Sequence, residues 1–418
     1  MAWSAGKMKQ IPWSSLSARS CRNRRKGCNF AWEQRKLGDV CEPITDSIDT
    51  QKYPNEVFAE YSMPAFDASM KPDIVLGSSM NSVRKIITRP CLLVNKLNVR
   101  KKRIWYVKKP NKNAVCSAEF IPLYSDTVDL TFLNQVAKSE TFTRYLENHS
   151  SGSSNSQKRI TPRSLMLSKL HIPTIEEQKL IGKIFESLDH TITLHEEKKR
   201  QLERLKSALL KKMFADKSGY PAVRFEGFGG KWDQCKLGNV GTFRGGFGFP
   251  ENEQGNIDGI AFYKVSDMND SCNTLTMRKA SNYVTSSQIS KNKWKPILNQ
   301  NIIFAKVGAA VYLERKRKAM GPFLLDNNMM AFQPKDADID YIYYVFQRLR
   351  ISKHAQVGTL PSLNASELRN ITIYIPSLNE QKAVADLMVS LDHTIILYDF
   401  KLELLKKLKS SLLQHMFI

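Results

Sequence analysis

The 418-residue sequence has no apolar run long enough to span a bilayer, and no apolar signal-peptide core follows its basic N-terminus. Its seven cysteines form no Cys-x-x-Cys pair and have no histidine at zinc-ligand spacing. An odd number of scattered cysteines is typical of reduced, mostly buried thiols and disfavours a disulfide framework. These features predict a globular, cytoplasmic protein without a structural zinc site.

Catalytic signatures are also missing from the sequence. Residues 227–231 resemble the end of a phosphate-binding loop, but Trp232 stands where a Ser or Thr would bind magnesium. The glycine-rich segment 244–248 lacks Gly-x-Gly-x-x-Gly spacing, which indicates a turn. Neither an Asn-Pro-Pro-aromatic methylation motif nor a His-Glu-x-x-His helix occurs. Asp189-His190 and Asp392-His393 could support acid–base chemistry, but their position on a repeated helix favours a capping or packing role.

Positive charge is what the sequence has in excess. Lys and Arg (63) outnumber Asp and Glu (40), which gives a formal net charge of +23 and a pI near 9.6. This balance favours a polyanionic partner, with nucleic acid as the leading candidate. Residues 1–29 combine dense basic charge with little apolar periodicity, so we expect this segment to be disordered.

A long segment of the chain occurs twice. Residues 172–214 and 375–417 align without a gap, and roughly half of the paired positions are identical. In each copy a proline precedes a long run of helix formers, so each copy is predicted to be one long helix. A shorter repeat with the pattern Trp-x-Gln-x-Lys-Leu-Gly begins at Trp32 and at Trp232. Each repeat unit therefore starts with this motif, continues through a variable region and ends in the long helix.

Both predicted helices carry a narrow apolar seam with heptad spacing, which is typical of helices that pack against another helix. Two copies in one chain supply the partner, and a short connection favours an antiparallel pair. Two amphipathic helices packed separately on their own domains are the alternative. The residues predicted for the seam and for partner docking are Leu188, Ile192, Leu202, Leu205, Leu209, Leu391, Ile395, Leu405, Leu408 and Leu412.

Repeats and composition divide the chain into six predicted parts. They are 1–29, a basic segment expected to be disordered; 30–171, a first mixed domain; 172–215, a first long helix; 216–228, a linker; 229–374, a second mixed domain; and 375–418, a second long helix. Strand-like runs, among them 91–94 and 301–305, alternate with shorter helical stretches in both variable regions, including a helical stretch over 129–147. The sequence therefore predicts an α+β fold with an internal repeat.

Both variable regions contain side chains that can reach phosphates and base edges. In the first region these candidates are Lys96, Asn98, Arg100, Lys101, Lys102, Arg103, Ser154, Asn155, Lys158 and Arg159. In the second region they are Lys306, Arg315, Lys316, Arg317, Lys318, Asn327 and Asn328. A solvated surface turn explains any single cluster equally well, but the recurrence in both halves favours nucleic-acid binding.

Beyond its N-terminal segment the sequence resembles the specificity (S) subunit of type I restriction-modification systems. The resemblance rests on the Trp-x-Gln-x-Lys-Leu-Gly motif, the Ile-Pro-x-x-x-Glu-Gln-Lys join and the Leu-Asp-x-x-Ile helix, which occur in both halves in the family's order. Residues 304–308 and 326–331 resemble one type of target-recognition domain. Residues 96–98, 103–105 and 117–120 resemble another.

The resemblance implies two mixed α/β target-recognition domains, each reading one half of a split double-stranded DNA site. It implies two long antiparallel helices that form a coiled coil and dock two methyltransferase (modification) subunits and, through them, the restriction/motor subunits. S-adenosylmethionine, ATP and magnesium would act on those partners, and the chain itself would hold no cofactor or metal and perform no catalysis. The alternatives are a fused DNA methyltransferase or nuclease, and a coiled-coil protein that binds nucleic acid without sequence preference.

Overall fold

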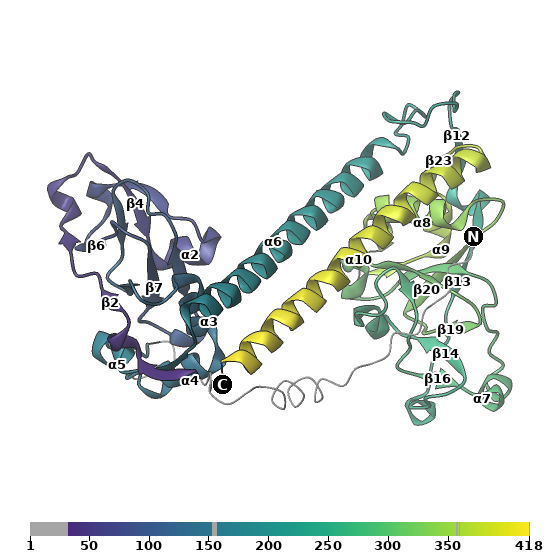
Figure 1. Ribbon diagram of the computed structural model, residues 1–418. Helices are drawn as coiled ribbons and strands as arrows, with labels where there is room; N and C mark the ends of the chain where they lie inside the picture. Colours follow the sequence, from purple (N-terminus) through teal and green to yellow (C-terminus); the bar gives the residue numbers. More distant parts are fainter. Residues whose placement is uncertain (1–31, 153–156, 357, 359, 418) are drawn as a thin grey trace, which may run out of the picture. The chain divides into compact units, whose positions relative to one another are not determined.

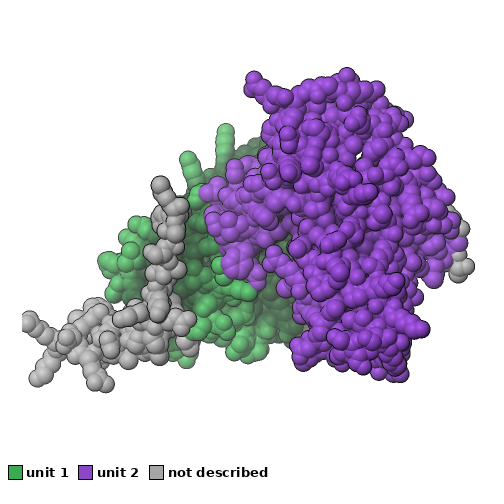
Figure 2. Space-filling view, turned by 90° about the vertical axis from the view of Figure 1, so that its right-hand side faces the viewer, with its two compact units in different colours: residues 1–192, 404–418 green, residues 193–403 purple. Residues whose placement is uncertain are grey.

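The computed structural model describes residues 32–152, 157–356, 358 and 360–417. The predicted disordered segment 1–29 lies outside these residues. The chain divides into two compact units (Figure 2). Unit 1 has two segments, one up to Ile192 and one from Leu404 onward, and unit 2 is Thr193–Glu403. Each unit holds one variable region and part of both long helices. Among the described residues, no helix has the length and apolar character that crossing a membrane requires.

Unit 1 is built on a four-stranded sheet of order β2-β10-β7-β8 and a five-stranded sheet of order β3-β6-β9-β4-β5. Its strands are β1 (Glu33–Lys36), β2 (Glu42–Pro43), β3 (Ser47–Ile48), β4 (Val57–Tyr61), β5 (Asp73–Leu76), β6 (Arg84–Ile86), β7 (Cys91–Asn95), β8 (Ile104–Val107), β9 (Ala114–Cys116), β10 (Phe120–Tyr124) and β11 (Lys169–Ile172). Its shorter helices are α2 (Met63–Ser69), α3 (Leu130–Lys138), α4 (Glu140–Asn148) and α5 (Pro162–Met166). The helical stretch predicted over 129–147 is confirmed and consists of two helices, because Ser139 ends α3 and its hydroxyl caps α4 by accepting from the Phe142 N–H at 3.2 Å.

Unit 2 contains a five-stranded sheet of order β13-β20-β17-β18-β15 and a three-stranded sheet of order β16-β14-β19. Its strands are β12 (Asp233–Lys236), β13 (Gly241–Gly245), β14 (Ile260–Tyr263), β15 (Thr276–Met277), β16 (Tyr283–Val284), β17 (Asn301–Ala305), β18 (Lys316–Ala319), β19 (Phe323–Leu325), β20 (Met329–Pro334), β21 (Ala355–Gln356), β22 (Ser362–Leu363) and β23 (Thr372–Ile375). Its shorter helices are α7 (Ser286–Lys291), α8 (Ile339–Arg348) and α9 (Ala365–Arg369).

The central strands β7 and β17 are buried at every position, and their side chains alternate between two cores. In unit 1, Leu92 and Val94 face the core that also contains Phe185 of the long helix, while the intervening Leu93 faces a second core. Burial on both faces explains why these strands are continuous apolar runs in the sequence. It is also why they were correctly predicted as strands.

The repeated Trp-x-Gln-x-Lys-Leu-Gly motif closes each unit onto its long helix. β1 pairs antiparallel with β11, and β12 pairs antiparallel with β23, in the same register. The indole Nε1–H of Trp32 donates to Glu177 at 3.2 Å, and that of Trp232 donates to Glu380 at 3.3 Å. The two copies of the repeat thus build the same junction between strand and helix.

The long helices are α6 (Ile175–Lys212) and α10 (Leu378–Met416), and they run antiparallel to each other (Figure 1). Within unit 2, Lys199 pairs with Asp399 at 2.6 Å and Lys206 pairs with Asp392 at 2.5 Å, so the helices advance in opposite directions. Within unit 1, Lys409 pairs with Asp189, also at 2.5 Å. The two aspartates of the Asp-His pairs therefore join the two helices through ion pairs.

The apolar seam is less regular than predicted. Ile192 and Leu391 are buried as expected, but Leu205 and Leu408 are each 47% exposed and do not belong to the seam. Their neighbours Lys206 and Lys409 face the opposite helix to form the ion pairs, and adjacent helical residues point about 100° apart. Leu188, Leu202, Leu209, Ile395, Leu405 and Leu412 are half-buried, and of these Leu188, Leu202, Leu209 and Leu412 pack against the domain cores. A long helix thus packs both against the other long helix and against the domain cores, which are the two arrangements considered from the sequence.

Candidate nucleic-acid interface

In unit 1, backbone hydrogen bonds gather three loops where β7 ends and β10 begins. The N–H of Lys96 donates to the carbonyl of Glu119 at 2.8 Å, and the carbonyl of Lys96 accepts from the N–H of Ile160 at 3.0 Å. Asn98 has a φ of 52°, and its N–H donates to the carbonyl of Lys158 at 3.0 Å. These bonds bring together predicted binding residues that lie far apart in the sequence.

Unit 2 repeats this frame with different side chains. The N–H of Lys306 donates to the carbonyl of Asn328, and the carbonyl of Lys306 accepts from the N–H of Leu363, both at 2.8 Å. Gly308 has a φ of 81°, and its N–H donates to the carbonyl of Pro361 at 2.8 Å. Each of these three backbone hydrogen bonds has a counterpart around Lys96, although the two variable regions share little sequence. We call these two sets of loops the recognition loops.

The glycine-rich segment 244–248, which the sequence indicated only as a turn, borders the recognition loops of unit 2. A Cβ on Gly246 would lie 2.1 Å from the carbonyl oxygen of Asp326, so a larger residue does not fit there. A Cβ on Gly245 would lie 3.6 Å from Nζ of Lys306. Gly245 and Gly246 are the sequence feature from which this close approach of the backbone to the Lys306 ammonium could have been predicted.

Several predicted cations of unit 1 already have carboxylate partners. Arg103 is only 9% exposed and binds both carboxylate oxygens of Asp67, at 2.8 and 2.6 Å. The Arg103 guanidinium lowers the pKa of the Asp67 carboxyl, mainly through these hydrogen bonds. This geometry makes Arg103 a structural residue. Arg100 pairs with Glu147 at 2.5 Å, Lys102 pairs with Glu140, and Arg159 pairs with Glu119 at 3.0 Å.

The basic run of unit 2 is residues 315–318, and all but its first residue belong to β18. Its side chains mostly bind other groups of the same unit. Lys316 is 2% exposed, pairs with Glu314 and donates to the carbonyl of Leu349 at 2.9 Å, so its assignment as a DNA contact is wrong. Burial lowers the pKa of Lys316, and Glu314 partly offsets this effect. Arg315 donates to Asn269, and Lys318 pairs with Asp340.

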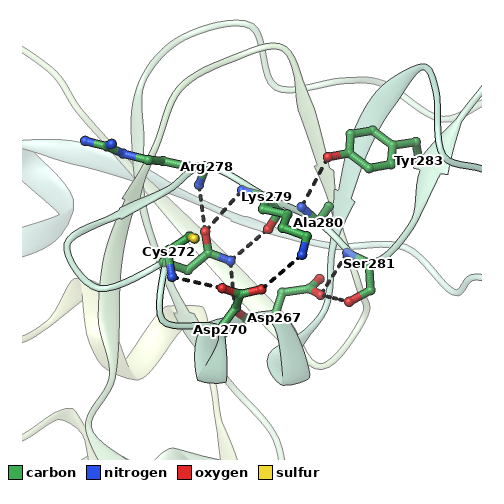
Figure 3. A network of polar contacts seen from close by, with 9 residues as sticks. Asp267, Asp270, Cys272, Arg278, Lys279, Ala280, Ser281 and Tyr283 are labelled. Carbon is green, nitrogen blue, oxygen red and sulfur yellow. Dashed lines mark hydrogen bonds and ion pairs between the residues drawn. The ribbon is translucent and has the colours of Figure 1, made fainter. Parts of the chain in front are cut away.

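Arg317 is held by the polar network that follows η7 (Val265–Asn269), because its Nε donates to the carbonyl of Asn273 at 2.6 Å. In Figure 3 the side chain of Asp267 accepts from the Ser281 N–H at 3.0 Å and from the Ser281 hydroxyl at 2.6 Å. The Asn273 side chain donates to the carbonyls of Asp267 at 2.9 Å and Lys279 at 2.7 Å. Since these bonds are internal to the loop, the network is a scaffold.

The predicted residues that remain placed for contact with nucleic acid lie on or beside the recognition loops. They are the exposed Lys101, Asn327 and Asn328 and the half-buried Lys96, Asn98, Lys158 and Lys306. Ser154 and Asn155 lie outside the described residues. Within 32–152, 157–356 and 360–417, no three or more His, Cys, Asp or Glu side chains gather in a group that could hold a metal ion.

A sequence profile of the family described as "type I restriction modification DNA specificity domain" matches residues 29–204 and again 229–407. The chain belongs to this family. The two matches coincide with the two repeat units found in the sequence, so the resemblance stated from the motifs is confirmed. They also cover both recognition loops and most of both long helices.

Curated relatives and a solved structure agree with this assignment. The chain is 26% identical to the type I restriction enzyme HindI specificity subunit of Haemophilus influenzae over 188 residues, which are 44% of this chain and 41% of the relative. It is 23% identical to the MjaVIII specificity subunit of Methanocaldococcus jannaschii over 266 residues, which are 59% of this chain and 60% of the relative. The chain therefore spans about half the length of these relatives.

The crystal structure of the type I restriction-modification S subunit from M. genitalium has a TM-score of 0.59 and 15% identity to this chain. The match covers 94% of this chain and 98% of the other. At this identity the likeness shows a shared fold. The predicted α+β fold with its internal repeat and long antiparallel helices is thus confirmed.

Proposed function

We propose that this chain is the specificity subunit of a type I restriction-modification complex, non-catalytic by itself, and that it reads a bipartite, asymmetric DNA site in the cytoplasm. The observation that carries the proposal is the backbone frame shared by the recognition loops of the two units. The two units share this set of backbone hydrogen bonds but carry different side chains on it, which suits the recognition of two half-sites of different sequence. Family membership supports DNA as the polymer that the recognition loops contact.

The chemistry of the recognition loops supports contact with duplex DNA. Lysine offers a strong point charge to phosphate or to the acceptors on guanine, and asparagine can bond adenine through two atoms. Lys96 and Asn98 in unit 1, and Lys306 with Asn327 in unit 2, place one cation and one amide in each set of loops. Lys101 is exposed beside the first set and suits a phosphate contact.

The repeat also supports the docking of two copies of one partner. Leu194 of α6 and Leu397 of α10 occupy equivalent repeat positions and are 57% and 50% exposed. Leu205 and Leu408 form a second equivalent pair at 47% each. Exposed leucines at matching positions suit two methyltransferase subunits, which in turn would bind the restriction/motor subunits. S-adenosylmethionine, ATP and magnesium would act on those partners.

Mapping methylated adenines tests the proposed DNA reading. We expect cells that express this chain with its modification subunit to gain methylation at a two-part sequence with a fixed gap and two different halves. Lys96→Ala should relax or weaken selection of one half only, and Lys306→Ala should affect the other half only. A palindromic motif, or a change in both halves from either single variant, would contradict the proposal.

Two further assays separate the alternatives. Methylation or cleavage by the purified chain alone would indicate a fused enzyme. If random duplex competed as well as the mapped site, the chain would be a non-specific nucleic-acid-binding protein.

Docking can be tested by counting subunits. Leu205→Arg and Leu408→Arg should each reduce the number of bound methyltransferase subunits from two to one, and the double variant should bind none. The mass of the purified complex gives this number, and unchanged helix content by circular dichroism is the control. Two bound subunits in the double variant would place docking elsewhere.

A further inference from the structure

A cavity of about 520 Å³ in unit 1 is lined by a group of lysines that the proposed function does not use. Lys102 follows η4 (Val99–Lys101), Lys138 ends α3, and Lys406 and Lys409 come from the last turns of α10. The carboxylates in the lining are Glu140 of α4 and Asp189 of α6, and Ser410 and Gln414 add uncharged polar groups. We call this the lysine cavity.

Four lysines and two carboxylates line the lysine cavity. Asp189 pairs with Lys409 at 2.5 Å, and Glu140 pairs with Lys102. The lining therefore holds more ammonium groups than carboxylates. Burial, and then the nearby Lys409, lower the pKa of Lys138 to about 8, while Asp189 partly opposes this shift. A bound anion would favour the charged form of Lys138.

The equivalent position in unit 2 is built differently. The N–H groups of Asp129 and Asp338, which cap α3 and α8, each donate to the equivalent glutamine of a long helix at 2.9 Å, so α3 and α8 correspond. Counting from these caps places Gln347 at the position of Lys138. Asp392, the equivalent of Asp189, accepts from the Tyr344 hydroxyl at 2.7 Å in addition to its lysine. The lysine group is thus specific to unit 1.

We propose that the lysine cavity binds a phosphate group. Four lysines line one open cavity, and several ammonium groups together match the negative oxygens of a phosphate. The phosphate can belong to a DNA backbone or to a small free anion. Binding of a small free anion would not depend on the proposed recognition of a DNA sequence. Binding of a DNA backbone phosphate rests on that proposed function.

Calorimetric titration of the full chain with pyrophosphate, at low salt and neutral pH, tests the site. Lys138→Gln introduces the residue that unit 2 has at this position, and Lys406→Gln changes an exposed residue of the lining. We expect each to weaken pyrophosphate binding about tenfold or more. The matched control is Arg278→Gln, which changes an exposed cation in a cavity of unit 2 that contains Asp392, the equivalent of Asp189, and this variant should bind pyrophosphate like the parent chain.

Salt titration of duplex binding identifies the source of the phosphate. If a DNA backbone occupies the cavity, Lys138→Gln should also lower the salt slope of DNA binding by about one. An unchanged slope together with weakened pyrophosphate binding assigns the site to a free anion. The proposal is overturned if the parent chain binds no pyrophosphate, or if both cavity variants bind it as tightly as Arg278→Gln. Loss of all DNA binding by the parent chain would count against the proposed function alone.

Discussion

His195 of α6 and Tyr398 of α10 occupy the same position in the two copies of the repeat, and their rings pack edge to face with centroids 5.3 Å apart. A residue of one repeat copy thus meets its own equivalent of the other copy within the helix pair. Nδ1 of His195 is buried there, and no described residue hydrogen-bonds to it. The centre of the helix pair therefore carries an unsatisfied polar atom.

Replacing His195 with Phe should stabilise the chain, because an apolar ring of similar size removes the buried unsatisfied nitrogen and keeps the aromatic contact. We expect a gain of about 1 kcal/mol in the free energy of unfolding, measured by urea denaturation. Tyr398→Phe is the control and should change stability less. A destabilised His195→Phe variant would mean that Nδ1 has a water-mediated partner.

Arg224→Ala should be strongly destabilising. Arg224 binds both oxygens of Glu380 at 2.7 and 2.8 Å, and Glu380 is 2% exposed, so the variant leaves a buried carboxylate without its cation. We expect a loss of about 3–5 kcal/mol in the unfolding free energy. Arg200→Ala, which breaks the exposed pair with Glu197, should cost less than about 1 kcal/mol. Equal effects of the two variants would show that Glu380 is hydrated.

The sequence predicted the long helices from their apolar periodicity, the repeat from its recurring residues, and the central strands from their short continuous apolar runs. It did not distinguish Lys101, which is exposed, from Arg103 two residues later, which is buried against Asp67. That difference depends on a residue far away in the chain. The shared frame around Lys96 and Lys306 was equally hidden, because backbone hydrogen bonds form with many side chains and leave no sequence pattern.

Lys101 and Arg103 should therefore behave differently. Lys101→Ala should weaken binding to all duplexes and lower the salt slope by about one, with no change in stability, because an exposed phosphate contact is lost. Arg103→Ala should lower the unfolding free energy, because it leaves Asp67 without its partner. Fluorescence anisotropy at several salt concentrations and urea denaturation measure these effects. If Arg103→Ala lowered the salt slope and Lys101→Ala lowered stability, Arg103 would be released from Asp67 when DNA binds.

Lys138 should make stability depend on pH in the alkaline range. Its pKa is lowered from 10.5 to about 8 in the fold, where Lys102, Glu140, Asp189, Lys406 and Lys409 surround it. Between these two values the unfolded chain binds more protons, so the contribution of Lys138 to stability rises with pH. The parent chain should gain stability relative to Lys138→Gln between about pH 8 and pH 10, by less than about 3 kcal/mol. Parallel pH profiles would show that the ammonium is well hydrated.

The helix pair should set the gap between the two half-sites. Four residues inserted after Glu197 in α6 lengthen that helix by about 6 Å and turn its face by only about 40°. A matching insertion after Phe400 in α10 lies opposite the first, so Lys199 can still meet Asp399 and Lys206 can still meet Asp392. Since base pairs in DNA are about 3.4 Å apart, the unspecified gap in the methylated sequence should grow by about two base pairs.

Matched insertions of two residues are the control for this experiment. They turn each helix face by about 200°, so the ion pairs cannot re-form and methylation should be lost instead of shifted. The half-site sequences should stay the same in the four-residue variant, because the recognition loops are untouched. An unchanged gap with altered half-sites would show that the length of the helices does not determine the spacing.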